Sequence, residues 1–211
     1  INEAREKDKT KPKSIYSLHG IPVLLKDNIN YEGLATTAGS FALNNNRSKN
    51  AFVVDKLKEN GALILGKTNL SEWAYYFCNN CPSGYSALGG QTLNPYGRKI
   101  FDSGGSSSGS GAAISANFSS VSLGSETSGS ILSPSSANSI VGLKPTIGLV
   151  SRSGIVPISS TLDTSGPMTK NVIDNAIVLK AVSGFDENDF MSVNSEDIDL
   201  ESIVNLSLIH I

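Results

Sequence analysis

Residues 103–114 read Ser-Gly-Gly-Ser-Ser-Ser-Gly-Ser-Gly-Ala-Ala-Ile, a run of small residues that leads directly into a helix-forming segment. By composition alone, nine consecutive serines and glycines are typical of a flexible linker. A linker should separate two self-contained units, whereas here a helix over 112–117 and a strand over 121–124 follow at once. A glycine-rich turn that opens a helix presents unpaired backbone N–H groups to an anion or to a developing negative charge. We do not expect a phosphate loop, because no lysine occurs between Lys99 and Lys144.

Outward from this run, the chain alternates between strand-like and helix-like segments. Alternation of this kind favours an α/β layered fold. The apolar segments 21–25, 62–65 and 121–124 predict strands, and 140–150 is apolar but interrupted at Pro145. Helices are predicted over 51–60, with Asn50 as N-cap, over 69–76, and over 171–183, with Asn171 as cap.

A second small-residue cluster, Ser125-Glu126-Thr127-Ser128-Gly129-Ser130, follows the predicted strand 121–124. Small residues let several backbone N–H groups converge on one point, which is how an oxyanion hole is built. A serine in the same turn would lie beside that hole. The cluster therefore predicts a serine nucleophile with its oxyanion donors.

The base that activates such a serine is the next question. The only histidines are His19, in a turn, and His210, close to the end of the sequence. Neither is a good candidate for the base of a Ser-His-Asp triad. Lys26 follows the apolar run 21–25, and desolvation at the end of a buried strand lowers the pKa of a lysine toward neutrality. A surface lysine that pairs with Asp27 is the alternative interpretation.

Taken in order, these motifs resemble the amidase signature family. Within the family, 90–92 and 94–96 together with 125–127 are most similar to peptide amidases, which remove a C-terminal carboxamide. The resemblance covers residues 17–185 and implies a mixed β-sheet core with helices on both faces. It is carried by the segments 20–28, 66–73, 104–110, 126–131 and 141–146.

The resemblance also implies roles for individual residues. Ser130 would be the acylated nucleophile, Ser106 a bridging serine after a cis peptide bond, and Lys26 the base. The backbone N–H groups of Thr127, Ser128, Gly129 and Ser130 would form the oxyanion hole. No metal or organic cofactor is implied, and the expected substrate is a small-molecule or peptide amide.

Three positions depart from the common family pattern. Glu126 stands where many members carry Asp, Ser128 where they carry Gly, and Leu132 where they carry Arg. Leu132 argues against a substrate that needs an arginine clamp and against glutamine-amidotransferase subunits. Two alternatives stay open: an amidotransferase subunit with a protein partner, and a non-catalytic fragment whose Ser/Gly turns only pack or bind an anion.

Composition limits the kinds of molecule that the chain is expected to bind. A net charge of −2 and scattered basic residues argue against nucleic-acid binding. No run approaches the roughly 18 apolar residues of a membrane span. Oligomeric state cannot be inferred.

The ends of the sequence suggest a truncated domain. We expect a polar N-terminal segment over 1–16, an incomplete amidase-signature core over 17–185, an acidic solvated turn or linker over 186–205, and a sequence scar over 206–211.

Cys78 and Cys81 invite a metal or redox interpretation. A structural zinc site needs about four ligands, and no second cysteine pair exists, so we expect two thiols in or beside a loop. Trp73, Tyr75, Tyr76 and Phe77 are expected to pack as one face of the helix over 69–76, with substrate contact from the neighbouring loop as the alternative.

Overall fold

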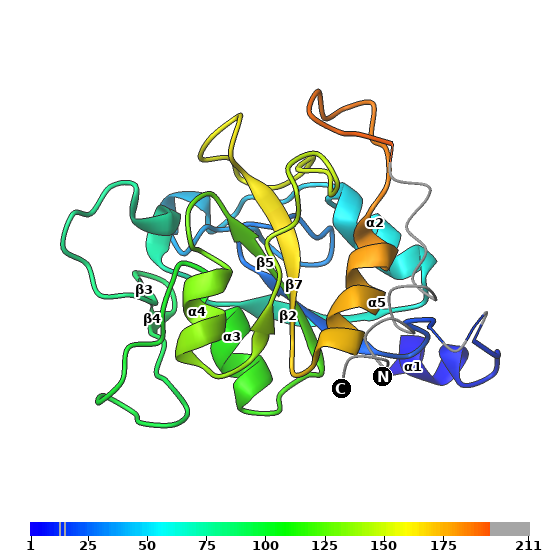
Figure 1. The fold of residues 1–211 in the computed structure, drawn as a ribbon, viewed down its shortest axis with the longest axis horizontal. Helices are drawn as coiled ribbons and strands as arrows, with labels where there is room; N and C mark the ends of the chain where they lie inside the picture. The colour runs from blue at the N-terminus through cyan, green and yellow to red at the C-terminus, as the bar shows by residue number, and fades with distance from the viewer. Residues whose placement is uncertain (13, 15, 195–211) are drawn as a thin grey trace, which may run out of the picture.

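The computed structural model describes residues 1–12, 14 and 16–194, and its centre is a five-stranded mixed sheet (Figure 1). Strand β1 pairs in parallel with both β2 and β5, and β7 runs antiparallel to both β5 and β6. The predicted mixed α/β fold is therefore confirmed. The strand order is β2 (Leu63–Thr68), β1 (Pro22–Lys26), β5 (Val121–Glu126), β7 (Thr164–Thr169) and β6 (Val141–Gly142).

Helices cover the sheet in two pairs (Figure 1). Helices α2 (Phe52–Glu59) and α5 (Val172–Val182) pack together over one face, and α3 (Ser108–Ser115) and α4 (Leu132–Ala137) form the second pair. The remaining elements are α1 (Asn2–Lys7), the 3₁₀ helices η1 (Phe41–Leu43) and η2 (Glu72–Tyr75), and a hairpin of β3 (Tyr85–Ser86) and β4 (Gly90–Gln91).

The alternation of side chains along the strands decides which face receives the chemistry. Val23 and Leu25 of β1 belong to the apolar core with residues of α2 and α5. Because successive strand residues point to opposite faces, Lys26 points toward α3 and the Ser/Gly cluster. Ser122 of β5 points the same way and donates a hydrogen bond to the backbone carbonyl of Ser110 in α3 (3.2 Å).

Helix α5 begins as the sequence predicts, since the Asn171 side chain accepts a hydrogen bond from the Asp174 N–H (2.8 Å). The N-cap predicted for α2 is wrong. Ala51 occupies that position, and the Asn50 side chain instead bonds the Glu32 N–H and the Asp55 carboxylate.

The helix predicted over 69–76 is also wrong. Strand β2 continues to Thr68, and the next residues hydrogen-bond to distant segments: Asn69 Nδ2 donates to the carbonyl of Gly84 (3.2 Å) and the Ser71 N–H donates to that of Ser106 (3.0 Å). Trp73 to Tyr75 have positive φ angles, which an α-helix does not allow. The predicted aromatic helix face therefore does not form.

Cys78 and Cys81 form a disulfide, so the expectation of two free thiols is wrong. Their Cα atoms lie 5.7 Å apart, a separation that a disulfide spans. The loop position was predicted correctly.

The acidic segment is less solvated than its composition predicts. Asp186 and Asp189 are buried; Asp186 accepts a hydrogen bond from Ser151 (2.5 Å), and Asp189 pairs with Arg152 (2.5 Å). Contacts with Ser151 and Arg152, which composition cannot reveal, tie this part to the core. Most of the remaining acidic segment, 195–205, and the predicted scar over 206–211 lie outside the described residues.

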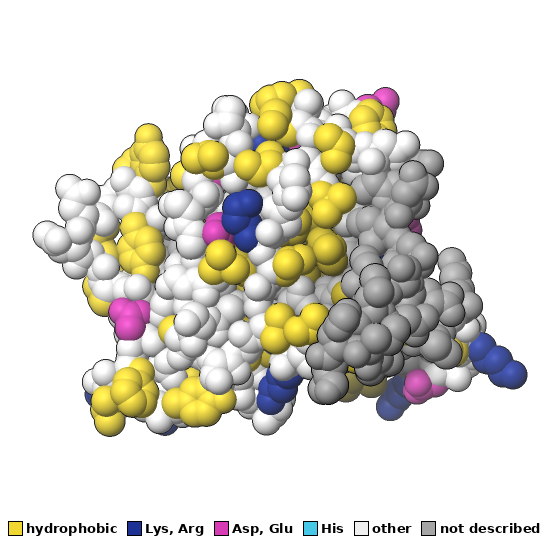
Figure 2. Space-filling view, in the orientation of Figure 1, with side chains coloured by type: hydrophobic (Ala, Val, Ile, Leu, Met, Phe, Trp, Pro, Cys, Tyr) yellow, Lys and Arg dark blue, Asp and Glu magenta, His cyan; other side chains and the backbone are white. Residues whose placement is uncertain are grey.

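On the face shown in Figure 2, lysine and arginine side chains do not gather into one patch, and some of them lie beside acidic side chains. None of the helices in the described part of the chain has the length and apolar character needed to cross a bilayer.

Candidate active site

Lys26 ends β1 and is 1% exposed, so its ammonium lies in the protein interior. Its Nζ donates hydrogen bonds to Ser106 Oγ (2.8 Å), Ser125 Oγ (3.0 Å) and the Ser125 carbonyl (3.1 Å). The Asn28 side chain holds Ser125 from the other side, since its Nδ2 donates to Ser125 Oγ (2.8 Å). Lys26 is thus fixed by hydroxyl and carbonyl oxygens, and the alternative of a surface lysine paired with Asp27 is wrong.

Burial lowers the pKa of Lys26 to about 7. Desolvation is the main cause, because removing an ammonium from water disfavours its charged form. The negative charges of Asp163 and Glu126 act in the opposite direction and keep the pKa from falling further. Near neutral pH a large fraction of Lys26 therefore carries a free electron pair.

Ser106 is fully buried, and the Gly105–Ser106 peptide bond is cis. The next residue along, Ser107, donates its N–H to the carbonyl of Ser130 (3.1 Å). This backbone bond places the two Ser/Gly clusters side by side, although they are distant in sequence. Lys26, Ser106 and the turn that carries Ser130 thus converge in one region of the protein.

Glu126 organises the turn from 127 to 130. This carboxylate is 3% exposed and accepts hydrogen bonds from the backbone N–H groups of Gly129 (2.8 Å), Ile131 (2.7 Å) and Leu132 (2.9 Å). The N–H of Gly129, a predicted oxyanion donor, is therefore already engaged. Within the described residues, no acceptor is found for the N–H groups of Thr127, Ser128 and Ser130.

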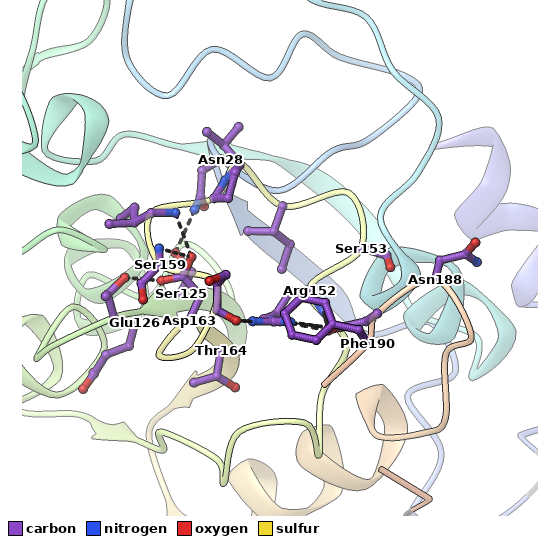
Figure 3. Close-up of a pocket in the computed structure, with 17 residues that line it drawn as sticks. Asn28, Ser125, Glu126, Arg152, Ser153, Ser159, Asp163, Thr164, Asn188 and Phe190 are labelled. Atoms are coloured by element: carbon purple, nitrogen blue, oxygen red, sulfur yellow. Dashed lines mark hydrogen bonds and ion pairs between the residues drawn. The ribbon is translucent and has the colours of Figure 1, made fainter. Parts of the chain in front are cut away.

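A cavity of about 230 Å³ opens beside this turn (Figure 3). Asp163 lies on its wall and accepts a hydrogen bond from the Thr127 hydroxyl. Arg152 also lies on the wall, but the Asp189 carboxylate neutralises its guanidinium, and hydrogen bonds from Arg152 lower the pKa of Asp189 to about 2. The cavity thus offers no free cation to a substrate carboxylate among its described lining residues.

A second cavity of about 260 Å³ adjoins the first. Trp73 and Phe77 line it, and their rings meet edge to face at 5.8 Å. Asn28 and the segment 156–158 line both cavities. Of the four aromatic residues that were expected to pack as a helix face, Trp73, Tyr76 and Phe77 therefore border a cavity next to the first one, and Tyr75 does not line it.

Sequence reasoning missed Ser125, Asn28 and Asp163 as neighbours of this site. Asn28 lies in the turn that follows β1, where the strand period gives no signal. No local signal points to Asp163, because its position depends on the pairing of β5 with β7. In the part of the chain that the structure describes, no group of three or more His, Cys, Asp or Glu side chains is placed to hold a metal ion.

Comparisons with known proteins agree with this arrangement. The family model described as Amidase matches residues 1–206. A protein of Arabidopsis thaliana named "Probable amidase" is 50% identical over 187 residues, which are 88% of this chain and 36% of that protein. The glutamyl-tRNA(Gln) amidotransferase of Thermoanaerobacter pseudethanolicus has one subunit that is 45% identical over 204 residues, which are 96% of this chain and 41% of that protein.

Solved structures agree as well. The native peptide amidase of Stenotrophomonas maltophilia superposes with a TM-score of 0.88 at 50% identity, over 94% of this chain and 41% of that enzyme. An amidase family protein of Bacillus anthracis gives a TM-score of 0.90 at 46% identity, over 94% of this chain and 40% of that chain. The chain thus spans well under half the length of these relatives. Together, the match of the family model along nearly the whole chain and these superpositions establish that the chain belongs to the amidase signature family.

Proposed function

We propose that this chain carries the catalytic centre of a serine amidohydrolase that converts a carboxamide to a carboxylate and ammonia. Ser130 is the nucleophile, Ser106 relays the proton, and Lys26 is the base. The observation that carries the proposal is the environment of Lys26: it is fully buried, has a pKa of about 7, and lies 2.8 Å from Ser106 Oγ. A lysine in that state accepts a proton near neutral pH.

Acylation begins when Ser130 Oγ attacks the carbonyl carbon of the substrate. The proton of Ser130 passes to Ser106 Oγ while the proton of Ser106 passes to Lys26 Nζ. When the tetrahedral intermediate collapses, the C–N bond breaks and the leaving nitrogen receives a proton back through Ser106. Ammonia departs, and the acyl group remains on Ser130 as an ester.

Deacylation uses the same relay with water as the nucleophile. Water attacks the ester carbonyl, its proton passes through Ser106 to Lys26, and Ser130 Oγ is reprotonated as the ester bond breaks. In both steps the carbonyl oxygen carries a developing negative charge. The free N–H groups of Thr127, Ser128 and Ser130 are the donors proposed to stabilise it, and Gly129 joins them if its N–H leaves Glu126.

For the substrate we propose a peptide that ends in a carboxamide. The 50% identity to the Stenotrophomonas peptide amidase supports this class. A neutralised Arg152 and an acidic wall favour a neutral carboxamide over a free carboxylate. An amidotransferase component is the second candidate, since one such protein is 45% identical to this chain.

A covalent serine probe tests the nucleophile in the complete protein as its gene encodes it. We expect the probe to label Ser130, and we expect Ser130→Ala and Lys26→Ala each to abolish labelling. Ser133→Ala is the matched control, because Ser133 is an exposed serine three residues further along. Full labelling without Lys26 would refute the relay, and labelling of another serine would refute the nucleophile.

The substrate class has its own assay. We expect ammonia release from a peptide carboxamide and none from free glutamine. The reverse preference would favour the amidotransferase candidate. No release from either, together with no labelling of Ser130, would favour a non-catalytic chain.

A further inference from the structure

The pairing of β5 with β7 places Asp163 against the proposed oxyanion turn. In the antiparallel ladder Glu126 is the partner of Thr164. Thr127 directly follows β5 and Asp163 directly precedes β7, so the same register continued by one residue sets Thr127 opposite Asp163. Their side chains meet, since the Thr127 hydroxyl donates to Asp163 Oδ1.

The other carboxylate oxygen of Asp163 holds a separate segment. Asp163 Oδ2 accepts hydrogen bonds from the backbone N–H groups of Ile158 (2.7 Å) and Ser159 (2.9 Å). Residues 155–160 line the cavity beside the turn (Figure 3). One side chain therefore connects the oxyanion turn to the wall of the cavity.

From these contacts we infer that Asp163 is a positioning residue for amide hydrolysis, which holds Thr127 by its hydroxyl so that the Thr127 N–H faces the reacting carbonyl oxygen. The inference rests on the proposed function of the turn. Glu126 holds the far end of the same turn through Gly129 (2.8 Å). With a carboxylate at each end, the donors between them are fixed before substrate arrives, which is the condition for effective oxyanion stabilisation.

Asp163 has a second effect that a purely structural residue would lack. Its charge, together with that of Glu126, raises the pKa of Lys26 against the lowering by burial. Asp163 in turn faces Arg152, whose guanidinium is already paired with Asp189. Removing the charge of Asp163 should lower the pKa of Lys26 further and so move the acidic limb of the pH–rate profile to lower pH.

The test compares variants in the complete protein, with a peptide carboxamide as substrate. Thr127→Val removes the hydroxyl and keeps the backbone N–H, whereas Thr127→Ser keeps both. Asp163→Asn removes the charge at nearly constant shape. Thr161→Ala is the control within the same loop, because Thr161 is exposed, is not among the residues that line the cavity, and its hydroxyl contacts only Ser159 among the described residues.

We expect Thr127→Val and Asp163→Asn each to lower kcat by about tenfold, with KM within about twofold, because misplacing one group by a fraction of an ångström costs about this much. Thr127→Ser should restore kcat to within about twofold, and Thr161→Ala should match the wild type. Combining Thr127→Val with Asp163→Asn should cost less than the product of the two single effects, since both substitutions disturb the same contact between Thr127 and Asp163. Only variants that carry Asp163→Asn should shift the acidic limb.

A kcat for Thr127→Val equal to that of the wild type would overturn the inference, and so would fully multiplicative effects in the double variant. If circular dichroism shows that Asp163→Asn does not fold, the kcat values of Thr127→Val and Thr127→Ser alone decide whether the Thr127 hydroxyl has a positioning role. Failure of the proposed function has a different signature: Lys26→Ala and Ser130→Ala would then keep their activity.

Discussion

Replacing Lys26 with methionine tests whether the lysine is held uncharged in the interior. In the unfolded chain its pKa is about 10.5, and burial lowers it to about 7 in the folded protein. Because the folded pKa is lower, the unfolded state binds a proton that the folded state lacks over the whole range between these values. The native lysine therefore destabilises the fold as pH falls from about 10.5 to 7, and the effect levels off below pH 7.

The size of this effect follows from the pKa shift. Each pKa unit corresponds to about 1.4 kcal/mol, so the penalty at pH 6.5 exceeds that at pH 10 by about 4 kcal/mol. Lys26→Met removes the penalty. It also removes hydrogen bonds to Ser106 and Ser125, a loss that is nearly independent of pH. The difference in the free energy of unfolding, Lys26→Met minus wild type, should thus be about 4 kcal/mol more positive at pH 6.5 than at pH 10.

Urea denaturation of both proteins at both pH values measures this difference in the complete protein. Lys180→Met is the matched control, since Lys180 lies exposed on α5 and should show no pH-dependent effect. A difference below about 1 kcal/mol for Lys26→Met would mean that the lysine keeps an ordinary pKa, and the reasoning would be refuted.

Three further predictions concern neighbouring features. Glu126→Ala should lower kcat for ammonia release by about 10²-fold because the turn loses the acceptor of three backbone N–H groups. An unchanged kcat would show that Glu126 does not organise the turn for catalysis. Because its pKa is lowered, the Asp189 carboxylate stabilises the fold above about pH 4 and loses this effect as pH falls toward 2. Arg152→Met should therefore lower the free energy of unfolding by about 1–2 kcal/mol at pH 6, after allowance for solvent screening, and by far less at pH 2. An equal loss at both pH values, measured by denaturant titration, would contradict this. Replacing Cys78 and Cys81 together by serine should lower the unfolding free energy by about 2 kcal/mol, and alkylation without reductant should modify neither cysteine in the native protein; ready alkylation would mean that the bridge does not form.

The sequence predicts the parts of the fold that depend on local patterns. The apolar run that ends at Lys26 predicted a buried strand, and a helix cap at Asn171 predicted the start of α5. Both follow from near-neighbour physics, namely the strand period and the capping of a helix by a side chain. The mixed sheet followed from the resemblance to the family.

Features set by distant partners could not be predicted. Strand β7 contains Gly166 and Pro167, which argue against a central strand, and it forms because it pairs with both β5 and β6. The segment after Thr68 reads as a helix, but bonds to Gly84 and Ser106 and the positive φ angles at 73–75 exclude an α-helix there.

The candidate site also has some features that local patterns predict and others that depend on distant partners. Lys26, Ser106 and Ser130 were proposed from short motifs, and the structure brings the first two into contact at 2.8 Å. The proximity of Ser130 depends on a backbone bond between segments distant in sequence. The engagement of the Gly129 N–H by Glu126 and the contact of Asp163 with Thr127 arise from the folded turn, which no local pattern specifies.

The central claim is that neutral Lys26 activates Ser130 through Ser106. The most direct measurement is the rate at which Ser130 becomes acylated, followed by mass spectrometry from pH 5 to pH 9 in the complete protein. The claim predicts a rate that rises with pH, reaches half its maximum near pH 7, and falls to about one hundredth of the maximum at pH 5. A rate that is flat across this range, or one that persists in Lys26→Ala, would contradict it.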